Sequence, residues 1–320
     1  MKRLILFLLL FAVMDLASVA SATTVAYWRF DDVDEPSIDT SETGLPVAAG
    51  NPLPDSDGQT VWRKAVHDWS GNGNDLTTWE WAWAGFNWSD DVPAAQIPLT
   101  DVENQLSMVH TQVMGCCPAS MTWSEQSLPG GIDLESITPS QFTIEASFKL
   151  DTIGWSHTIV GRDGRDVVAD GALAPLYFQV LDGKPTVQFA DVSRYWHMAQ
   201  GVDNVVTGQW YNMVAVSDGS TLSLYLDNIL IGQTDMTASG SPDTAMALGT
   251  GSGGDWEAGT WTVGRGMWNG GHVDRVYGNI DEVRISDTAL APSEFLFVPE
   301  PATIVLLGLG SLALIRRRRS

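Results

Sequence analysis

The 320-residue sequence contains few cysteines, and the two it has are adjacent, at Cys116 and Cys117. Such a pair can bridge only with itself inside the chain, so no set of disulfides holds this fold together. The pair is therefore either two thiols or a lone vicinal disulfide that stiffens a loop. His110 is the only histidine close by in sequence, which leaves a metal site at the cysteines short of ligands.

Basic residues are also scarce. The chain has 17 Lys and Arg against 39 Asp and Glu, a net charge of −22. Without residues 1–22 and 299–320, 11 basic and 37 acidic residues remain, a net charge of −26. Such a surface repels nucleic acid and anionic membranes and suits divalent cations, neutral glycans or simple solubility. The acidic composition does not imply disorder, because 44% of the residues are hydrophobic and 14 are Trp.

Long amphipathic helices and tandem repeats are missing, and short stretches of alternating polarity take their place. The clearest is residues 210–228, where valines and then leucines occupy every second position on either side of Asp218-Gly219. Period-two patterning marks strands with one buried face, and Asp-Gly is typical of a type I′ hairpin turn. Residues 142–150 alternate in the same way.

Further strands are expected throughout the chain, at 25–30, 157–161, 176–181, 185–190, 260–264 and 279–285. Asp182-Gly183-Lys184 indicates a second hairpin, and residues 291–296 can form a helical turn. Residues 79–140 read as an irregular insertion of loops and short strands. Many strands with closely spaced turns predict an all-β, two-sheet antiparallel β-sandwich of the jelly-roll type over residues 23–297.

The N-terminus has the pattern of a secretory signal peptide over residues 1–22. Lys2 and Arg3 precede an apolar run, Leu4 to Met14, that is too short to span a bilayer. Ala20-Ser21-Ala22 then forms a small-x-small site, so we expect signal peptidase to cut after Ala22.

The C-terminal segment, residues 298–320, carries Pro299-Glu300-Pro301, an apolar stretch from Ala302 to Ile315, and four arginines, Arg316 to Arg319. In that order and position they resemble the PEP-CTERM sorting signal of Gram-negative bacteria that make exopolysaccharide. The resemblance implies export, transient membrane anchoring by a short apolar helix over 302–315, and cleavage by an exosortase near Pro299-Glu300-Pro301. The protein would then reside at the cell surface or in the extracellular matrix.

Several short motifs occur in a recognisable order along residues 25–297. They are Tyr27-Trp28-Arg29-Phe30-Asp31, Asp68-Trp69-Ser70-Gly71-Asn72-Gly73-Asn74-Asp75, Phe142-Thr143-Ile144-Glu145-Ala146, Leu224-Tyr225-Leu226-Asp227-Asn228 and Ile280-Asp281-Glu282-Val283-Arg284-Ile285. Together they resemble a secreted laminin-G-like, concanavalin A-like jelly roll. The resemblance implies two face-to-face antiparallel sheets, and binding of a glycan or a protein more often than catalysis.

The same resemblance suggests a structural calcium site where the first and last strands lie side by side. Asp31, Asp32 and Asp281 would supply the carboxylate oxygens that a hard cation prefers. The alternative is that Asp281 caps a turn while the other two are solvated loop acids. A second oxygen-rich set, Asp68, Asn72, Asn74 and Asp75, lacks the spacing of an EF-hand loop and is predicted to be a turn.

Exposed tryptophans are the expected sugar contacts, because the apolar face of a pyranose packs on an indole ring. The residues chosen as ligand-binding are Trp79, Trp81, Trp83, Trp256 and Trp268. The alternative for each is burial in the core.

No catalytic residue is proposed. The Glu-x-Asp-x-x-Glu strand motif of related glucanases, the Gly-x-Ser-x-Gly and His-Glu-x-x-His motifs, and a phosphate-binding loop are all missing from the sequence. The sequence thus predicts an exported protein that binds polysaccharide or another glycan through a calcium-stabilised sandwich, and no nucleic acid. The alternative is a structural or adhesion protein of the matrix that makes protein contacts; a polysaccharide hydrolase is the least favoured.

Overall fold

The computed structural model describes residues 24–56, 63–79, 85–110, 119–122, 129–165, 173–251 and 258–298. The predicted processing residues Ala22, Pro299, Glu300 and Pro301, the apolar stretch 302–315 and the cysteine pair lie outside these ranges. Among the described residues, no helix is both long enough and apolar enough to cross a membrane.

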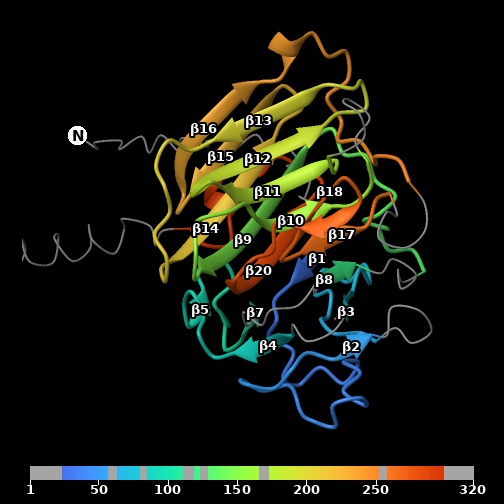
Figure 1. Cartoon of the computed structure of the whole chain (residues 1–320), viewed down its shortest axis with the longest axis vertical. Coiled ribbons are helices and arrows are strands. Elements are labelled where there is room, and N and C mark those ends of the chain that lie inside the picture. Colours follow the sequence, from blue (N-terminus) through green and yellow to red (C-terminus); the bar gives the residue numbers. More distant parts are fainter. Residues whose placement is uncertain are drawn as a thin grey trace, which may run out of the picture.

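Two large sheets form the molecule (Figure 1). In the first, which we call sheet A, the strand order is β16 (Ile229–Asp235), β15 (Thr221–Leu226), β14 (Trp210–Ser217), β9 (Phe142–Leu150), β20 (Gly278–Ser286), β7 (Ser107–His110) and β4 (Phe86–Ser89), and β1 (Thr24–Trp28) also pairs with β20. In the second, sheet B, the order is β13 (Trp196–Gln200), β12 (Lys184–Ala190), β11 (Leu176–Leu181), β10 (His157–Arg162), β17 (Trp261–Val263), β8 (Ala119–Thr122), β3 (Leu76–Trp79) and β2 (Asp55–Ser56). All of these pairs are antiparallel except β2–β3.

Smaller elements complete the described chain. They are the hairpins β5 (Gln96–Ile97) with β6 (Val102–Glu103) and β18 (Gly266–Trp268) with β19 (Gly271–Val273), and the 3-10 turns η2 (Thr237–Ser239) and η4 (Pro292–Glu294). The antiparallel sandwich predicted from the sequence is confirmed. The stretch expected to be an irregular insertion supplies β4 and β7 to sheet A and β8 to sheet B.

The core lies between the two sheets and follows the alternation of the strands. Phe148 and Met213 of sheet A and Phe178 and Val187 of sheet B belong to one buried apolar cluster. Burial of such side chains stabilises a fold by about 1.5–3 kcal/mol each. The opposite face of sheet A is covered by the C-terminal segment, where Phe295 packs on Val214 and Val216.

The hairpin turns only partly match the sequence prediction. Asp182 and Gly183 both have positive φ, 49° and 83°, as a type I′ turn requires. At Asp218-Gly219 only Gly219 is left-handed, with φ 87°, so the predicted type I′ turn is wrong. The Asp218 carboxylate instead accepts hydrogen bonds from the backbone N–H groups of Ser220 and Thr221, which stabilises a different turn.

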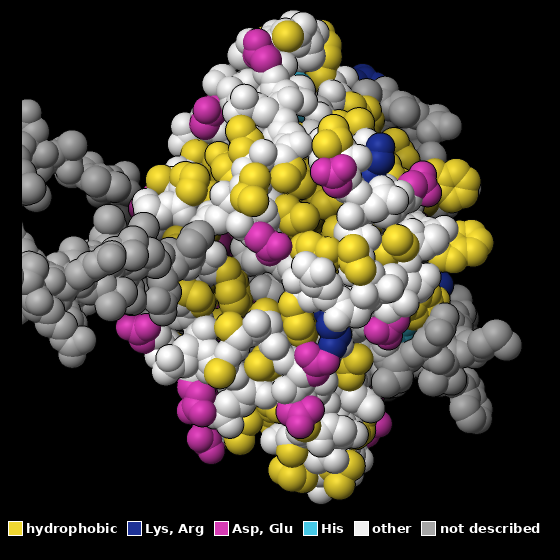
Figure 2. All heavy atoms as spheres, turned by 90° about the vertical axis from the view of Figure 1, so that its left-hand side faces the viewer, with side chains coloured by type: hydrophobic (Ala, Val, Ile, Leu, Met, Phe, Trp, Pro, Cys, Tyr) yellow, Lys and Arg dark blue, Asp and Glu magenta, His cyan; other side chains and the backbone are white. Residues whose placement is uncertain are grey.

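The surface reflects the acidic composition. Figure 2, which faces the left-hand side of Figure 1, shows acidic side chains spread over the whole face, whereas Lys and Arg emerge at only a few points. Hydrophobic side chains gather between them, mainly in the upper and middle parts of this face.

Candidate functional site

The candidate site begins at an irregularity in β20. On one side of this strand the partner changes along its length: Ile280 pairs with β7, whereas Val283 pairs with β1. Against β9 on the other side, the register shifts between Asp281 and Arg284, and Glu282 has φ 50°. This β-bulge places two successive acids, Asp281 and Glu282, inside the protein with no exposed surface.

These two acids belong to a buried carboxylate cluster, which we define as Asp31, Asp281 and Glu282. Arg29, at the end of β1, contacts both Asp31 (3.1 Å) and Glu282 (3.3 Å). The Tyr27 hydroxyl donates a hydrogen bond to Glu282. One guanidinium therefore pairs with two of the three carboxyl groups, those of Asp31 and Glu282.

Uncharged donors satisfy the rest of the cluster. The Asn104 Nδ2 group donates to Asp281 Oδ2 at 2.8 Å, and the Glu282 backbone N–H donates to Asp281 Oδ1 at 2.9 Å. The backbone N–H groups of Gln105 and Leu106 donate to Asp31 at 3.0 and 2.7 Å. Asp31 is thus held from a segment more than 70 residues away in the sequence.

The electrostatics of the cluster favour neutral forms or an added cation. Burial, and then the negative charge of Glu282, raises the pKa of Asp281 well above its ordinary value. Burial raises the pKa of Glu282 to about 7, although Arg29 and Tyr27 oppose the shift. Burial also raises the pKa of Asp31. A carboxylate taken out of water is stable only if it is paired, protonated or bound to a cation.

A cation fits this chemistry in part. The side-chain oxygen of Asn104 is buried and has no hydrogen-bond partner, next to the carboxylates of Asp281 and its neighbours. Carboxylate and amide oxygens are the ligands that Ca²⁺ prefers. Within the described ranges, however, no group of three or more His, Cys, Asp or Glu side chains is arranged to hold a metal ion.

Asp32 lies outside the cluster. Its carboxylate accepts hydrogen bonds from the His67 backbone N–H (3.1 Å) and from the Trp69 indole Nε1–H (3.0 Å). Of the three residues predicted as metal ligands, the structure therefore brings Asp31 and Asp281 together and commits Asp32 to a second network. Burial raises the pKa of Asp32 to about 6.

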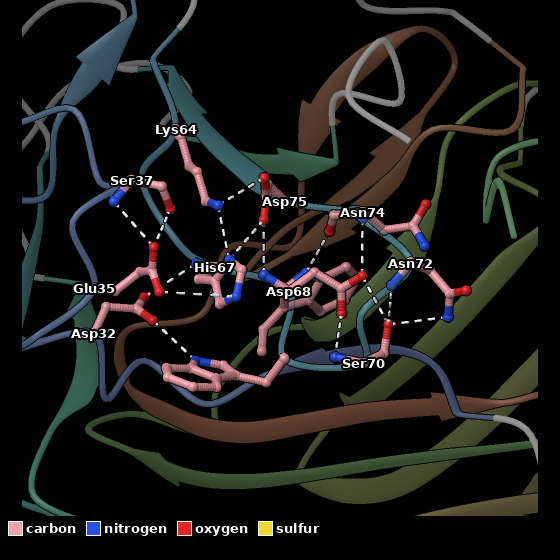
Figure 3. A network of polar contacts seen from close by, with 12 residues as sticks. Asp32, Glu35, Ser37, Lys64, His67, Asp68, Ser70, Asn72, Asn74 and Asp75 are labelled. Atoms are coloured by element: carbon pink, nitrogen blue, oxygen red, sulfur yellow. Dashed lines mark hydrogen bonds and ion pairs between the residues drawn. The ribbon is translucent and has the colours of Figure 1, made fainter. Parts of the chain in front are cut away.

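This second network is the turn that directly precedes β3, shown in Figure 3. The Asp68 carboxylate accepts hydrogen bonds from the backbone N–H groups of Tyr27 (2.9 Å), Ser70 (2.9 Å) and Asn74 (2.8 Å). The Asn74 amide group donates to the carbonyl oxygens of Val25 and Ile132, both at 2.9 Å. The oxygen-rich sequence is occupied in tying the chain together, which confirms the turn prediction.

Trp69 stands at the edge of this turn, and the residue is 43% exposed. Besides the hydrogen bond to Asp32, the Arg29 guanidinium lies 5.9 Å from the ring centre, and the His67 ring meets it edge-on at 5.0 Å. Arg29 therefore connects the exposed ring to the buried carboxylate cluster. Held at its nitrogen and against two side chains, the ring forms a fixed aromatic platform beside polar groups.

Half-exposed polar side chains flank the platform. His67 lies 3.2 Å from Asp75 and 2.7 Å from the Lys64 ammonium, and Glu35 lies 4.0 Å away on the other side. The hydrogen bond with Asp75 raises the pKa of His67 above its ordinary value. Figure 3 shows these groups converging on His67.

Trp69 was not among the tryptophans predicted to contact sugar, because it sits within a run of turn-forming residues. The structure places the predicted tryptophans as follows. Trp268 ends β18 and is 53% exposed, Trp79 is the last residue of β3, and Trp81, Trp83 and Trp256 lie outside the described residues.

The fold is a two-sheet jelly-roll sandwich, and the family match of the sequence agrees with it. Residues 128–295 match the concanavalin A-like lectin/glucanases superfamily, and the chain belongs to this family. Residues 297–319 match the PEP-CTERM protein-sorting motif, so this is an exported protein sorted to the cell envelope. No curated protein matches the sequence.

Similar solved structures include domain 4 of AbnA, an extracellular GH43 arabinanase from Geobacillus stearothermophilus, in complex with arabinotriose. It is 15% identical with a TM-score of 0.50, and the match covers 85% of this chain and 96% of that one. The botulinum neurotoxin serotype D binding domain follows at 10% identity and a TM-score of 0.46, covering 87% and 51%. The CBM40 of the Ruminococcus gnavus IT-sialidase, bound to α2,3 sialyllactose, has 13% identity and a TM-score of 0.41, covering 50% and 82%. At such identities, the arabinanase domain supports the fold and not a ligand.

Proposed function

We propose that this exported sandwich is a non-catalytic carbohydrate-binding protein and that Trp69 is its main sugar contact. The observation that carries the proposal is the exposed indole ring held in place by Asp32. A sugar ring has an apolar face of C–H groups that packs on an indole, and its hydroxyls need donors and acceptors at the rim. His67, which contacts Trp69, and Glu35 and Asp75, which flank His67, provide such groups.

A pre-positioned ring favours binding, because little conformational entropy is lost when the ligand arrives. The lectin and glucanase superfamily supports the proposal at the level of the family. The similar arabinanase domain is in complex with arabinotriose, which supports the proposal. Trp268, exposed on the β18–β19 hairpin, is a second proposed contact, and Trp79, Trp81, Trp83 and Trp256 stay predictions.

We further propose a structural calcium ion at the carboxylate cluster. Asp281 and the side-chain oxygen of Asn104 would hold it, Asp31 and Glu282 would join them only by turning from Arg29, and Asp32 would not take part. A bound cation would neutralise the excess negative charge under the platform. Because Arg29 contacts both the cluster and the Trp69 ring, a cation that orders the cluster would also help to fix the position of the ring.

The non-catalytic assignment agrees with the burial of these acids. Two carboxyl groups that cleave a glycosidic bond must flank the sugar. Asp281 and Glu282 have no exposed surface and already accept hydrogen bonds, so they are ill placed to reach one.

A glycan array with the purified domain, residues 23–298, tests the proposal. Hits on neutral or acidic polysaccharide fragments that disappear in Trp69→Ala, and persist in Trp155→Ala, would support it. Trp155 is a matched control because it is an exposed tryptophan, at 73%, on the β9–β10 loop. Unfolding curves of both variants must coincide with that of the parent, so that a lost hit reports the contact and not the fold.

An empty array would favour the alternative, a matrix or adhesion protein in which the sandwich is a scaffold for protein contacts. Release of reducing sugar from a polysaccharide, abolished by changing one acid, would instead indicate a hydrolase. We place the protein at the cell surface or in the extracellular matrix of a Gram-negative bacterium, which cell fractionation can check.

A further inference from the structure

Several of the most exposed apolar side chains lie at one end of sheet A. The register sets this end: Trp210, which begins β14, lies opposite Lys149 near the end of β9, and β15 ends beside the start of β14. The loops that follow β9 and β13 carry Trp155 (73% exposed), Val202 (78%) and Val206 (58%), and β16 begins with Ile229 (67%) and Leu230 (47%). We call these five residues the apolar end.

The turn between β15 and β16 is the best-defined part of the apolar end. Asp227 and Asn228 both have positive φ, 48° and 66°, so they form a tight two-residue turn. Asp227 exchanges hydrogen bonds with Asn212, through its backbone N–H (2.7 Å) and its carboxylate (2.9 Å). Ile229 and Leu230, which follow, are therefore presented on a rigid tip, whereas the next residue, Ile231, packs against the core.

The C-terminal segment leaves the folded domain at this same tip. The carbonyl oxygen of Phe297 accepts a hydrogen bond from the Asn228 amide at 3.4 Å. Val298, the last described residue, packs against the cluster of Val214, Val216 and Phe295. Phe297 also lines a hollow of about 190 Å³ together with Trp210 and Asp227.

The sequence beyond Val298 is short before it becomes apolar. Only Pro299, Glu300 and Pro301 separate Val298 from the apolar stretch 302–315, inside the matched sorting motif. Four Cα-to-Cα steps span at most about 14 Å. Whenever the apolar stretch is in a membrane, the exit point of the domain lies within that distance of it.

We propose that the apolar end is a docking surface for the lipid bilayer, which seats the domain on the membrane until the sorting segment is cut. The tether holds these side chains close to lipid at a high effective concentration, so that a few contacts suffice. The partly exposed Trp210 beside Phe297 suits the membrane–water interface, where Trp is enriched. The strongly acidic domain makes attraction to anionic head groups unfavourable, so the contact is apolar.

The proposal fixes an orientation of the domain. Figure 1 shows β18 on the opposite side of the molecule from β14 and β16, so we expect the hairpin that carries Trp268 to lie away from the bilayer. The inference rests on the sorting motif and not on carbohydrate binding, and the two can fail independently.

The test uses the full chain reconstituted into vesicles of phosphatidylethanolamine with a minority of phosphatidylglycerol and a trace of diazirine-bearing phosphatidylcholine. After illumination, mass spectrometry locates the lipid adducts. We expect them on the peptides that contain Ile229 and Leu230, Val202 and Trp155, and not on the peptide that contains Trp268.

The double variant Ile229→Ser, Leu230→Ser changes only exposed side chains, so it should fold, and it should lose adducts at the tip several-fold. Far-UV circular dichroism and the unfolding midpoint check its fold. Adducts spread evenly over the domain, or confined to the sorting segment, would overturn the proposal. Crosslinks between two copies through these loops, without lipid adducts, would overturn it in favour of a self-association surface.

Discussion

The indole Nε1–H of Trp69 donates to the buried carboxylate of Asp32 over 3.0 Å, and this hydrogen bond joins two parts of the chain 37 residues apart. It fixes an exposed aromatic ring with a side chain that has no exposure of its own. Hydrogen bonds to ionised groups are stronger than neutral ones, and this one is shielded from water. The orientation of the proposed sugar platform therefore depends on a residue that the sugar never touches.

Asp32→Asn should weaken glycan binding while leaving Trp69 in place. An amide offers one acceptor where the carboxylate offers two, so either the His67 backbone N–H or the indole loses its partner. We expect about ten-fold weaker binding, equivalent to about 1.4 kcal/mol. Isothermal titration of the best array hit measures it.

Asp34→Asn is the matched control, since it removes the same charge two residues along the chain. Equal losses in the two variants would show that net charge matters and not the hydrogen bond. Unchanged glycan binding in Asp32→Asn would contradict the role of Trp69 as the sugar contact.

Arg29→Lys should destabilise the fold even though the charge is kept. The Arg29 guanidinium spans Asp31, Glu282 and the carbonyl oxygen of Glu103 at once. A lysine ammonium is a point charge and cannot keep this fork of donors. Removing one partner of a buried ion pair costs about 3–5 kcal/mol, and we expect Arg29→Lys to lose about half of that.

Urea unfolding at neutral pH measures the free energy, and Arg63→Lys, a partly exposed arginine, serves as the comparison. A loss below about 0.5 kcal/mol, which is typical of surface changes, would contradict a bridging role for Arg29.

Much of this architecture could be predicted from the sequence. Strands with one buried face repeat every second residue, so β9, β14 and β15 were visible as alternation. The edge strand β16 was missed because Ile229–Asp235 is exposed or half-exposed along its whole length and has no alternation to detect. β13 was missed as well, although there exposed and buried residues do alternate.

The site was less predictable, because tertiary contacts decide it. Pairing of the first and last strands correctly suggested that Asp31 meets Asp281. It did not reveal the β-bulge that brings Glu282 into the cluster. It also did not reveal that Asp32 binds Trp69 and lies outside the cluster. Both depend on partners from distant segments, such as Asn104, which donates to Asp281 across 177 positions.

The variant Asn104→Asp should distinguish a cluster that binds a metal ion from one that is held by hydrogen bonds and ion pairs alone. Without a cation, a fourth carboxyl group beside Asp281 replaces a donor with a repelling charge, so we expect a loss of about 1–3 kcal/mol. With calcium, the same carboxyl group adds a hard ligand and should tighten binding several-fold. Asn104→Ala should be destabilised in both conditions.

Thermal unfolding with millimolar calcium and with chelator distinguishes these cases. Rescue of Asn104→Asp by calcium, but not of Asn104→Ala, would support the site. Equal behaviour of the two variants would count against any ion at the cluster.

The stability that the buried acids contribute to the domain should fall as the pH rises from about 5 to about 8 in the presence of a chelator, whereas the lowered pKa values of His110, His157 and His272 act in the opposite direction in the lower part of this range. The folded-state pKa of Glu282 is raised to about 7 and that of Asp32 to about 6, and that of Asp281 is raised as well. In the unfolded chain these groups release their protons near pH 4. Between the two ranges these acids bind more protons in the folded state than in the unfolded state, so their contribution to stability decreases with increasing pH.

Calcium favours the ionised carboxylates, so its stabilising effect should be small at pH 5 and grow across the same window. The midpoint of unfolding, recorded from pH 5 to 8 with calcium and with chelator, should give two curves that diverge as the pH rises. Parallel curves would mean that calcium acts elsewhere, and a calcium effect largest at pH 5 would contradict binding at these carboxylates.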